Sequence, residues 1–250
     1  MPKHRLLLWS GPRNVSTALM YSFAQRPDTR VVDEPLYAHY LAVSGAAHPG
    51  REEVLASQEQ DASKVVRDLI LGPGDRPVLF FKQMAHHLVG VDRAFLSKTV
   101  NVILTRDPRE MLPSLRVQLG IPVLRDTGYA VQTGLLTELR ELGQDPPVLD
   151  AREVLTNPRG VLTELCMRLG IPFEDAMLAW KPGPRPEDGV WAPHWYKNVH
   201  RSTGFERYRP KSEPFPRELE PLLAECSPHY EALSRVAIRA RATGVRGLRG

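Results

Sequence analysis

Five short apolar runs alternate with helix-like stretches, and this alternation constrains the fold more than any other feature of the sequence. Each run is rich in Leu, Val, Ile or Phe and is short enough to be a buried β-strand. The runs occupy residues 5–10, 29–37, 76–87, the first part of 98–115, and 146–155. Because strands that alternate with helices form βαβ units, the sequence predicts a three-layer α/β fold. Helices are expected to flank a mostly parallel central sheet.

The stretches between these runs carry helix signals. Helical spacing of apolar residues follows the first run, and Asp107 and Pro108 have the residue types that cap and begin a helix. The sequence shows no internal repeat and no interdomain linker, so we expect one domain over residues 1–250. The Arg-rich stretch from about residue 235 to the end is expected to be a frayed tail.

Composition narrows the possible ligands and locations. The 33 Lys and Arg residues only slightly outnumber the 29 Asp and Glu residues. This charge favours anionic ligands such as nucleotides without requiring nucleic acid. Cys166 and Cys226 lie far apart without CxxC spacing, which gives neither a zinc site nor a disulfide framework. The apolar runs are too short for a signal peptide or a membrane span, so we expect a soluble, cytoplasmic protein. The oligomeric state stays open.

The stretch "GPRNVST" at residues 11–17 joins the first predicted strand to a predicted helix. Backbone N–H groups and the helix dipole favour an anion at such a junction, and Arg13 adds a fork of donors. The spacing is close to the P-loop pattern G-x-x-x-x-G-K-[ST], but Ser16 and Thr17 replace the Gly-Lys pair. The loop is therefore expected to bind phosphate without a metal ion. Alternatively, the two hydroxyls only cap the helix.

This loop resembles the 5′-phosphosulfate loop of the PAPS-dependent sulfotransferases, which use 3′-phosphoadenosine 5′-phosphosulfate (PAPS) as sulfuryl donor. The family pattern is roughly P-[KR]-S-G-[ST]-T, and Asn14 and Val15 replace its usual Ser and Gly. The resemblance implies that the donor is bound by Pro12, Arg13, Asn14, Val15, Ser16 and Thr17. It covers roughly residues 5–175 and implies the P-loop nucleotide-hydrolase-like fold of these enzymes.

A second motif resembles the family's 3′-phosphate site, R-[DN]-P-x-x-x-x-x-S. The stretch "RDPREMLPS" places Arg106 and Ser114 at that spacing. Arg106 is expected to leave its strand at the carboxyl edge of the sheet, where such folds bind ligands. A salt bridge at a helix start and a polar helix face are the alternative roles. The family's late G-x-x-G-x-W-K loop is missing, and Arg201 and Gly204 are the replacements that we expect near the 3′-phosphate.

The general base has several candidates. Glu34 lies in "DEPLY", which resembles the Glu-Pro segment that carries the base in some sulfotransferases. The residue before a proline is expected to be extended, which would aim Glu34 from the strand end toward the donor sulfur. His86 and His87 follow the third run, where many family members have a base after Lys in a K-x-H pattern. Here Lys82, also a candidate catalytic residue, lies four residues before His86 instead of two. We rank Glu34 before His86, and His86 before His87. A solvated strand end is the alternative role of Asp33 and Glu34.

The resemblance implies transfer of a sulfuryl group from PAPS to a hydroxyl (or amine) of a small-molecule or carbohydrate acceptor. The other product is 3′,5′-adenosine bisphosphate, and the reaction needs no metal. Arg13 is expected to stabilise charge on the departing phosphate. Within the aromatic segment 180–205, residues 191–205 are expected to cover the nucleotide or shape the acceptor pocket. A metal-dependent nucleotide kinase would need a loop lysine and an acidic metal site. A non-catalytic nucleotide- or nucleic-acid-binding module would keep the anion contacts but need no base.

Overall fold

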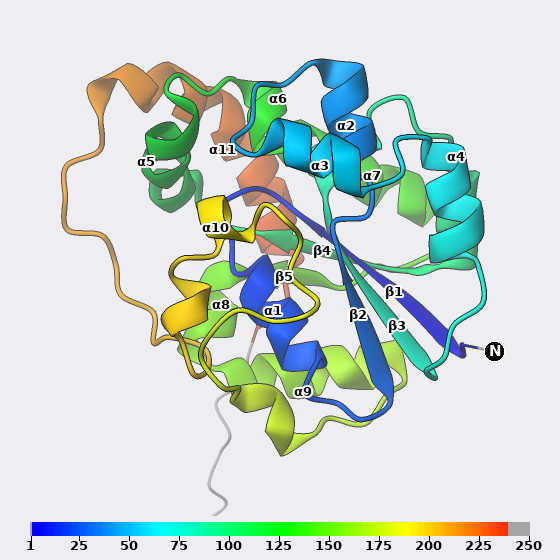
Figure 1. The fold of residues 1–250 in the computed structure, drawn as a ribbon. Helices are drawn as coiled ribbons and strands as arrows, with labels where there is room; N and C mark the ends of the chain where they lie inside the picture. Colours follow the sequence, from blue (N-terminus) through cyan, green and yellow to red (C-terminus); the bar gives the residue numbers. More distant parts are fainter. Residues whose placement is uncertain (1, 240–250) are drawn as a thin grey trace, which may run out of the picture.

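A computed structural model describes residues 2–239, and its centre is a five-stranded, all-parallel sheet with the strand order β2-β3-β1-β4-β5 (Figure 1). The strands are β1 (His4–Ser10), β2 (Thr29–Asp33), β3 (Val78–Met84), β4 (Val100–Thr105) and β5 (Val148–Asp150). The predicted α/β fold with a parallel central sheet is confirmed.

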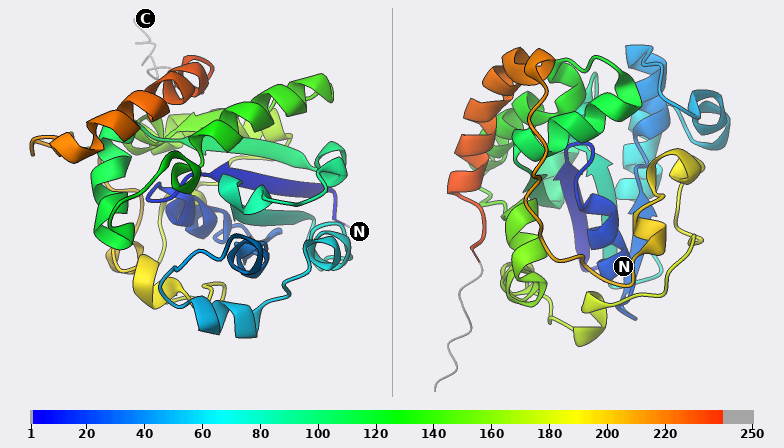
Figure 2. Two further views of the ribbon diagram at one scale, coloured as in Figure 1. Left: turned by 90° about the horizontal axis from the view of Figure 1, so that it is seen from above. Right: turned by 90° about the vertical axis from the view of Figure 1, so that its left-hand side faces the viewer.

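Strand β1 lies in the middle of the sheet because its side chains are apolar on both faces, as a parallel strand requires. Leu6 and Leu8 pack into one core with helices α1 (Ser16–Phe23) and α9 (Pro158–Leu169). Leu7 and Trp9 pack into a second core with helix α7 (Tyr129–Glu141). Helices therefore cover both faces, and the three layers are visible in Figure 2.

The remaining helices surround these layers. They are α2 (Tyr37–Ser44), α3 (Arg51–Ser57), α4 (Ala62–Lys64), α5 (Pro108–Leu119), α6 (Leu124–Thr127), α8 (Ala151–Thr156), α10 (Ala192–Trp195) and α11 (Glu220–Arg235). Asp107 caps α5 by accepting the N–H of Arg109 at 2.8 Å, and Pro108 is the first helical residue, as predicted. No helix within residues 2–239 combines the length and the apolar character needed to cross a membrane.

The fifth run was predicted as a strand over residues 146–155, but only Val148–Asp150 form a strand and residues 151–155 are helix. Strand β5 ends at Asp150, whose side chain accepts the N–H of Arg152 at 2.8 Å and so caps α8. An aspartate at a helix start satisfies a backbone donor that would otherwise lack a partner, and this capping ends the strand. The predicted frayed tail falls largely on residues 240–250, which lie outside the described residues.

The loops that follow the carboxyl ends of the strands lie at one edge of the sheet, and they carry candidate site residues. The helix after β1 covers one face, whereas α7, which follows β4, packs on the other. Where the helices that follow two neighbouring strands lie on opposite faces, an open parallel sheet leaves a crevice that can bind ligands. Gly11 allows the loop after β1 to approach closely, because a Cβ atom there would lie 2.8 Å from the carbonyl oxygen of Thr127.

Candidate active site

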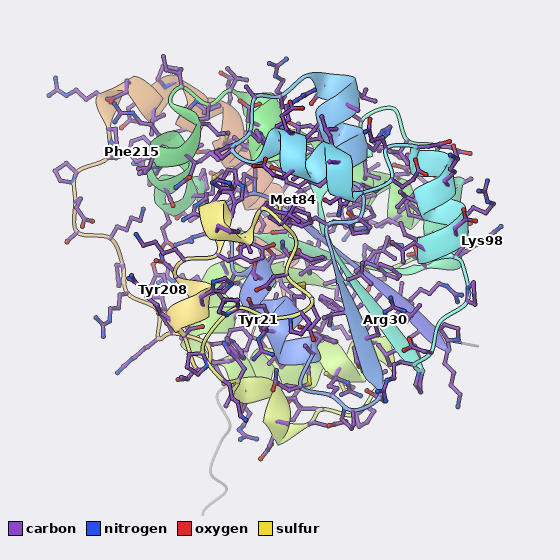
Figure 3. The ribbon with its side chains drawn as sticks, viewed as in Figure 1. Tyr21, Arg30, Met84, Lys98, Tyr208 and Phe215 are labelled. Atoms are coloured by element: carbon purple, nitrogen blue, oxygen red, sulfur yellow. The ribbon has the colours of Figure 1, made fainter. Side chains whose placement is uncertain are left out.

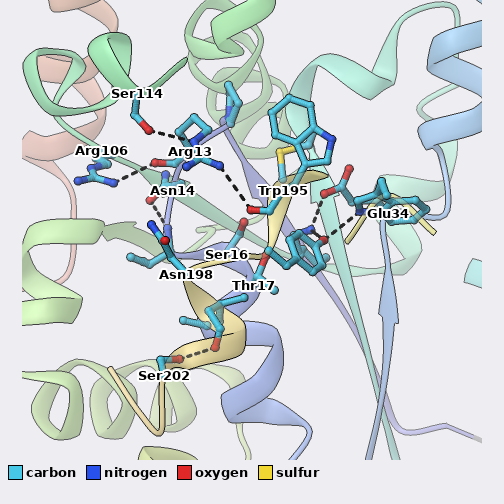
Figure 4. Close-up of a pocket in the computed structure, with 18 of the residues that line it drawn as sticks. Arg13, Asn14, Ser16, Thr17, Glu34, Arg106, Ser114, Trp195, Asn198 and Ser202 are labelled. Atoms are coloured by element: carbon cyan, nitrogen blue, oxygen red, sulfur yellow. Dashed lines mark hydrogen bonds and ion pairs between the residues drawn. The ribbon is translucent and has the colours of Figure 1, made fainter. Parts of the chain in front are cut away.

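A pocket of about 510 Å³ lies at the carboxyl edge of the sheet. Four strand ends and the segment 180–205 contribute to its wall. Among the predicted site residues, it is lined by Pro12, Arg13, Asn14, Val15, Ser16, Thr17, Glu34, Lys82, His86, His87, Arg106, Ser114 and Gly204. Figure 4 shows the two arginines on one side of the pocket and Glu34 on the other, with Ser16 and Thr17 between them. The fold thus joins motifs that lie up to about 190 residues apart in sequence.

The loop after β1 is fixed by Asn14, one of the two residues that depart from the family pattern. Its side-chain oxygen accepts the N–H of Val15 at 2.9 Å, and its amide nitrogen donates to the carbonyl oxygen of Leu104 at 3.2 Å. Arg13 has a φ of 51°, a left-handed conformation that costs a non-glycine residue about 1 kcal/mol or more. Asn14 therefore supports a strained loop in which Arg13 faces the pocket.

Helix α1 begins with free donors at the pocket. Val15 is its N-cap residue, and no side chain caps it. Ser16 and Thr17 are the first two helical residues, so the alternative that their hydroxyls cap the helix is wrong. Within residues 2–239, neither hydroxyl has a hydrogen-bond partner, although both residues are buried. The N–H groups of this helix start, which no side chain among the described residues caps, favour an anion together with the helix dipole and the two hydroxyls.

Two arginines lie beside this helix start. Arg13 Nε donates to Ser114 Oγ at 3.0 Å, and no carboxylate within residues 2–239 forms a salt bridge with it. Burial and the nearby charge of Arg106 lower the pKa of Arg13. Arg106 donates to the carbonyl oxygen of Arg13 at 2.9 Å and pairs with Glu110 at 3.3 Å. This cluster carries more positive charge than its carboxylates compensate.

Lys211 adds a third cation, which lies outside the two predicted motifs. It lies in an extended segment whose flanking residues are anchored, and Figure 3 shows these anchors, Tyr208 and Phe215. Tyr208 donates to Glu110 at 2.6 Å, and the guanidinium of Arg109 lies 5.6 Å from the Phe215 ring. Lys211 lines the pocket, and burial and the charge of Arg106 lower its pKa. Its signal in the sequence is a basic stretch, "RYRPKSEP".

Glu34 does not have the extended backbone predicted for a residue before proline. Its φ is 38°, in the left-handed region. Its N–H donates to the carbonyl oxygen of Lys82 at 2.8 Å, and its own carbonyl oxygen accepts the N–H of Tyr37 at 3.0 Å. These two hydrogen bonds make a tight turn at the end of β2, and they outweigh the local preference. The prediction of an extended Glu34 is therefore wrong, but its side chain still lines the pocket.

The Glu34 side chain belongs to a buried charge cluster, not to a solvated strand end. Lys82 Nζ lies 2.7 Å from Asp33 Oδ1 and also pairs with Glu34 Oε1. The exposed fractions of these side chains are 1% for Lys82, 1% for Asp33 and 8% for Glu34. Burial raises the pKa of Glu34, Lys82 opposes this change, and the negative charge of Asp33 adds to it. A carboxylate with a raised pKa is suited to accept a proton near neutral pH.

His86 and His87 belong to a cluster of rings. His87 stacks on Tyr37 and Tyr40 at centroid distances of 4.9 and 4.8 Å, and His86 packs edge-on against Tyr40. Burial lowers the pKa of His86 to about 3 and that of His87 well below its ordinary value. Both imidazoles are therefore neutral at pH 7 and are weak bases, which favours Glu34 in the predicted ranking.

The segment 180–205 contributes aromatic and polar groups to the pocket wall. Trp191, Trp195, Tyr196 and Asn198 line it, together with Val199, Ser202 and Gly204. Arg201 is exposed and does not line the pocket, so the structure does not support its predicted contact with the 3′-phosphate. The short 3₁₀ turn Val199–Arg201 directs Val199 inward, which leaves Arg201 on the other side.

Comparison with known proteins identifies the family. Residues 4–238 match a family model described as a sulfotransferase domain. The chain belongs to this sulfotransferase domain family. Two curated relatives are branched-chain-amino-acid aminotransferase-like proteins 1 and 2 of Arabidopsis thaliana, which are 43% and 40% identical to it over 226 residues. The match covers 90% of this chain but 40% of each relative, so the chain spans less than half of their length.

Solved structures confirm the sulfotransferase fold. The sulfotransferase domain from the curacin biosynthetic pathway has a TM-score of 0.52 at 16% identity, covering 91% of this chain and 98% of that one. A sulfotransferase from Alicyclobacillus acidocaldarius has a TM-score of 0.55 at 14% identity, with 96% of both chains covered. At these identities the likeness concerns the fold of the sulfotransferase domain.

Other pocket residues of the sulfotransferase domain were not among the predicted site residues. They include Tyr37, His48, Met84, Leu155, Asn198, Glu206 and Lys211. Tyr37 and His48 are hydrogen-bonded at 2.9 Å and belong to the ring cluster beside Glu34. Tyr37 ends the "DEPLY" segment and His48 lies in the polar stretch that follows it, and only the folded chain brings the two side chains together at the pocket.

Proposed function

We propose that this sulfotransferase domain transfers a sulfuryl group from PAPS to a hydroxyl (or amine) of a small acceptor. The observation that carries the proposal is a single pocket with a cationic helix start at one end and a buried Glu34 at the other. The helix start and Arg13 fit a 5′-phosphosulfate, and Arg106 with Ser114 fits a 3′-phosphate. Kinase chemistry would place a lysine in the loop after β1, where Ser16 and Thr17 stand.

Glu34 and Arg13 have separate roles in the proposed reaction. Glu34 takes the proton from the acceptor hydroxyl as the acceptor oxygen forms its bond to sulfur. The bond between sulfur and the bridging oxygen breaks, and the departing phosphate keeps the electron pair. Arg13 and the N–H groups at the start of α1 stabilise this negative charge, because preorganised donors act most strongly where charge develops. The products are the sulfated acceptor, a protonated Glu34 and 3′,5′-adenosine bisphosphate.

A thermal-shift experiment tests the donor class. The protein is heated with 3′,5′-adenosine bisphosphate, with ATP and Mg²⁺, or with single-stranded DNA. We expect the bisphosphate without metal to raise the melting temperature most, because two separate phosphates match two cationic positions. A larger shift with ATP and Mg²⁺ would favour a nucleotide kinase, and a larger shift with DNA would favour a nucleic-acid-binding module.

Arg106→Ala is expected to weaken bisphosphate binding by at least about tenfold, because a charge-assisted contact to phosphate is lost. Ser114→Ala should weaken it less, since only a neutral hydrogen bond is removed. Isothermal titration measures both affinities. Arg116→Ala is the control, because Arg116 lies on the same helix as Ser114 but pairs with Glu218 outside the pocket. Unchanged affinity in a folded Arg106→Ala protein would remove Arg106 from the donor site.

The ring cluster beside Glu34 favours an uncharged, ring-bearing acceptor over an acidic saccharide. Tyr37, His48 and Trp195 line this end with neutral rings, and the nearby cation, Lys82, is already paired with carboxylates. An acceptor carboxylate would be buried here without a partner. We therefore expect kcat/KM to be about tenfold or more higher for 4-methylphenol than for 4-hydroxybenzoate. Equal values would argue against an acceptor site among these rings.

A further inference from the structure

The hydroxyl of Tyr196 completes the buried charge cluster from outside the sheet. Tyr196 follows helix α10 in the segment 180–205. Its hydroxyl donates to Asp33 Oδ2 at 2.7 Å, and it accepts from Lys82 Nζ at 2.5 Å and from Trp191 Nε1 at 3.0 Å. A tyrosine hydroxyl has one proton and two lone pairs, so its bonding capacity is fully used.

The same contacts divide the hydrogen bonds unequally between the two carboxylates. The three donors of the Lys82 ammonium go to Asp33, Glu34 and Tyr196. Asp33 also accepts from Tyr196 and from the N–H of Gly189 at 3.2 Å, so it has three donors in all. Within residues 2–239, Lys82 is the only hydrogen-bond donor to the Glu34 carboxylate. Both oxygens of Asp33 are therefore hydrogen-bonded, whereas Glu34 Oε2 has no donor among the described residues and is left to accept a proton.

We propose that Tyr196 is a positioning residue that holds Asp33 and Lys82 in place, so that Glu34 keeps a carboxylate oxygen for the acceptor. The role of Glu34 as the base rests on the proposed function. The hydrogen bonds of Tyr196 to Asp33 and Lys82 do not depend on it. The residue before Tyr196 extends this link to the donor end, because the Trp195 carbonyl oxygen lies 3.5 Å from Arg13 Nη1. One short turn of the chain therefore contacts both ends of the pocket.

Loss of the Tyr196 hydroxyl is expected to change the pKa of Glu34 in a predictable direction. The titratable groups around Glu34 are Asp33 on β2, Lys82 on β3, Tyr37 on α2 and Tyr196, and His48, His86 and His87 line the same pocket. Without the hydroxyl, the negative charge of Asp33 is less compensated. A less compensated negative charge on Asp33 disfavours a negative charge on Glu34, so the pKa of Glu34 rises.

Tyr196→Phe tests this role with two readouts. The first is the acidic limb of the kcat/KM profile with PAPS and 4-methylphenol, which should move up by about one pH unit, as the loss of one charge-assisted hydrogen bond predicts. The second is the pH titration of the Glu34 side-chain ¹³C carboxyl signal, assigned with Glu34→Gln, which should move by the same amount. Tyr21→Phe is the matched control, because Tyr21 donates to Asp188 of the same segment at 2.7 Å but does not line the pocket. Both readouts should keep their wild-type values in this control.

Asp33→Asn is expected to move both readouts in the opposite direction. It removes the neighbouring negative charge, so both readouts should move to lower pH. An unmoved carboxyl titration in Tyr196→Phe and in Asp33→Asn would overturn the proposal. A moved titration with an unmoved rate profile would support the positioning role and would show instead that Glu34 is not the base. If circular dichroism shows that Tyr196→Phe does not fold, the titration of Asp33→Asn decides.

Discussion

Glu34→Gln is expected to lower kcat by about 10²–10⁴-fold, the usual contribution of a positioned general base. Glutamine keeps the size of the side chain and can accept a hydrogen bond from Lys82, but it cannot take a proton from the acceptor. Glu34 lines the pocket and has one hydrogen-bond donor among the described residues, so the change alters the chemistry more than the fold. Steady-state transfer from PAPS to 4-methylphenol measures kcat. Bisphosphate affinity should stay at the wild-type value, since the donor cations lie at the other end of the pocket.

The pH profile separates Glu34 from the two histidines. A base must be deprotonated, so the rate rises as pH passes upward through its pKa. Burial and Asp33 raise the pKa of Glu34, so the acidic limb should lie above the ordinary glutamate value of about 4.3. His86→Asn and His87→Asn should both remain active. If Glu34→Gln kept wild-type turnover while either histidine variant was inactive, the histidine would replace Glu34 as the base.

The fold, and the meeting of the two anion-site motifs in one pocket, could be predicted because their signals are local. A strand, its loop and the next helix are contiguous in sequence, so Arg13, Ser16 and Thr17 could be assigned to one anion site from their spacing. Arg106 and Ser114 lie within a single strand-to-helix junction in the same way. The parallel sheet then brings the two junctions together at its carboxyl edge, where Arg106 donates to the carbonyl oxygen of Arg13.

The other end of the pocket depends on long-range contacts that no local pattern encodes. Tyr196 reaches Asp33 across 163 positions of sequence, and this contact assigns Asp33 to a buried cluster instead of a solvated strand end. The left-handed backbone of Glu34 is set by a hydrogen bond to Lys82 on the neighbouring strand, against the preference of a residue before proline. Arg201 was assigned from its motif alone, and a single 3₁₀ turn determines that it faces away.

Arg13→Ala is expected to lower kcat by about 10²–10³-fold, as when one preorganised donor to a developing negative charge is removed. Bisphosphate affinity should fall less than kcat, because the bridging oxygen gains most of its charge in the transition state and Arg106 still binds the product. Alanine adopts the left-handed φ of 51° with about the same strain as arginine, so the change mainly removes the guanidinium.

Arg13→Lys and Arg168→Ala complete this test. Lysine keeps the charge but not the fork that reaches Ser114, so its kcat should lie between those of alanine and wild type. Arg168 donates to Glu164 at 2.8 Å on α9 and does not line the pocket, so Arg168→Ala should leave kcat unchanged and report any general effect of removing an arginine. A melting temperature that falls in Arg13→Ala while kcat per folded molecule stays at the wild-type value would show that Arg13 supports the loop structurally. With both variants measured against Glu34→Gln, the loss at the donor end can be distinguished from the loss at the base, because only the former includes weaker bisphosphate binding.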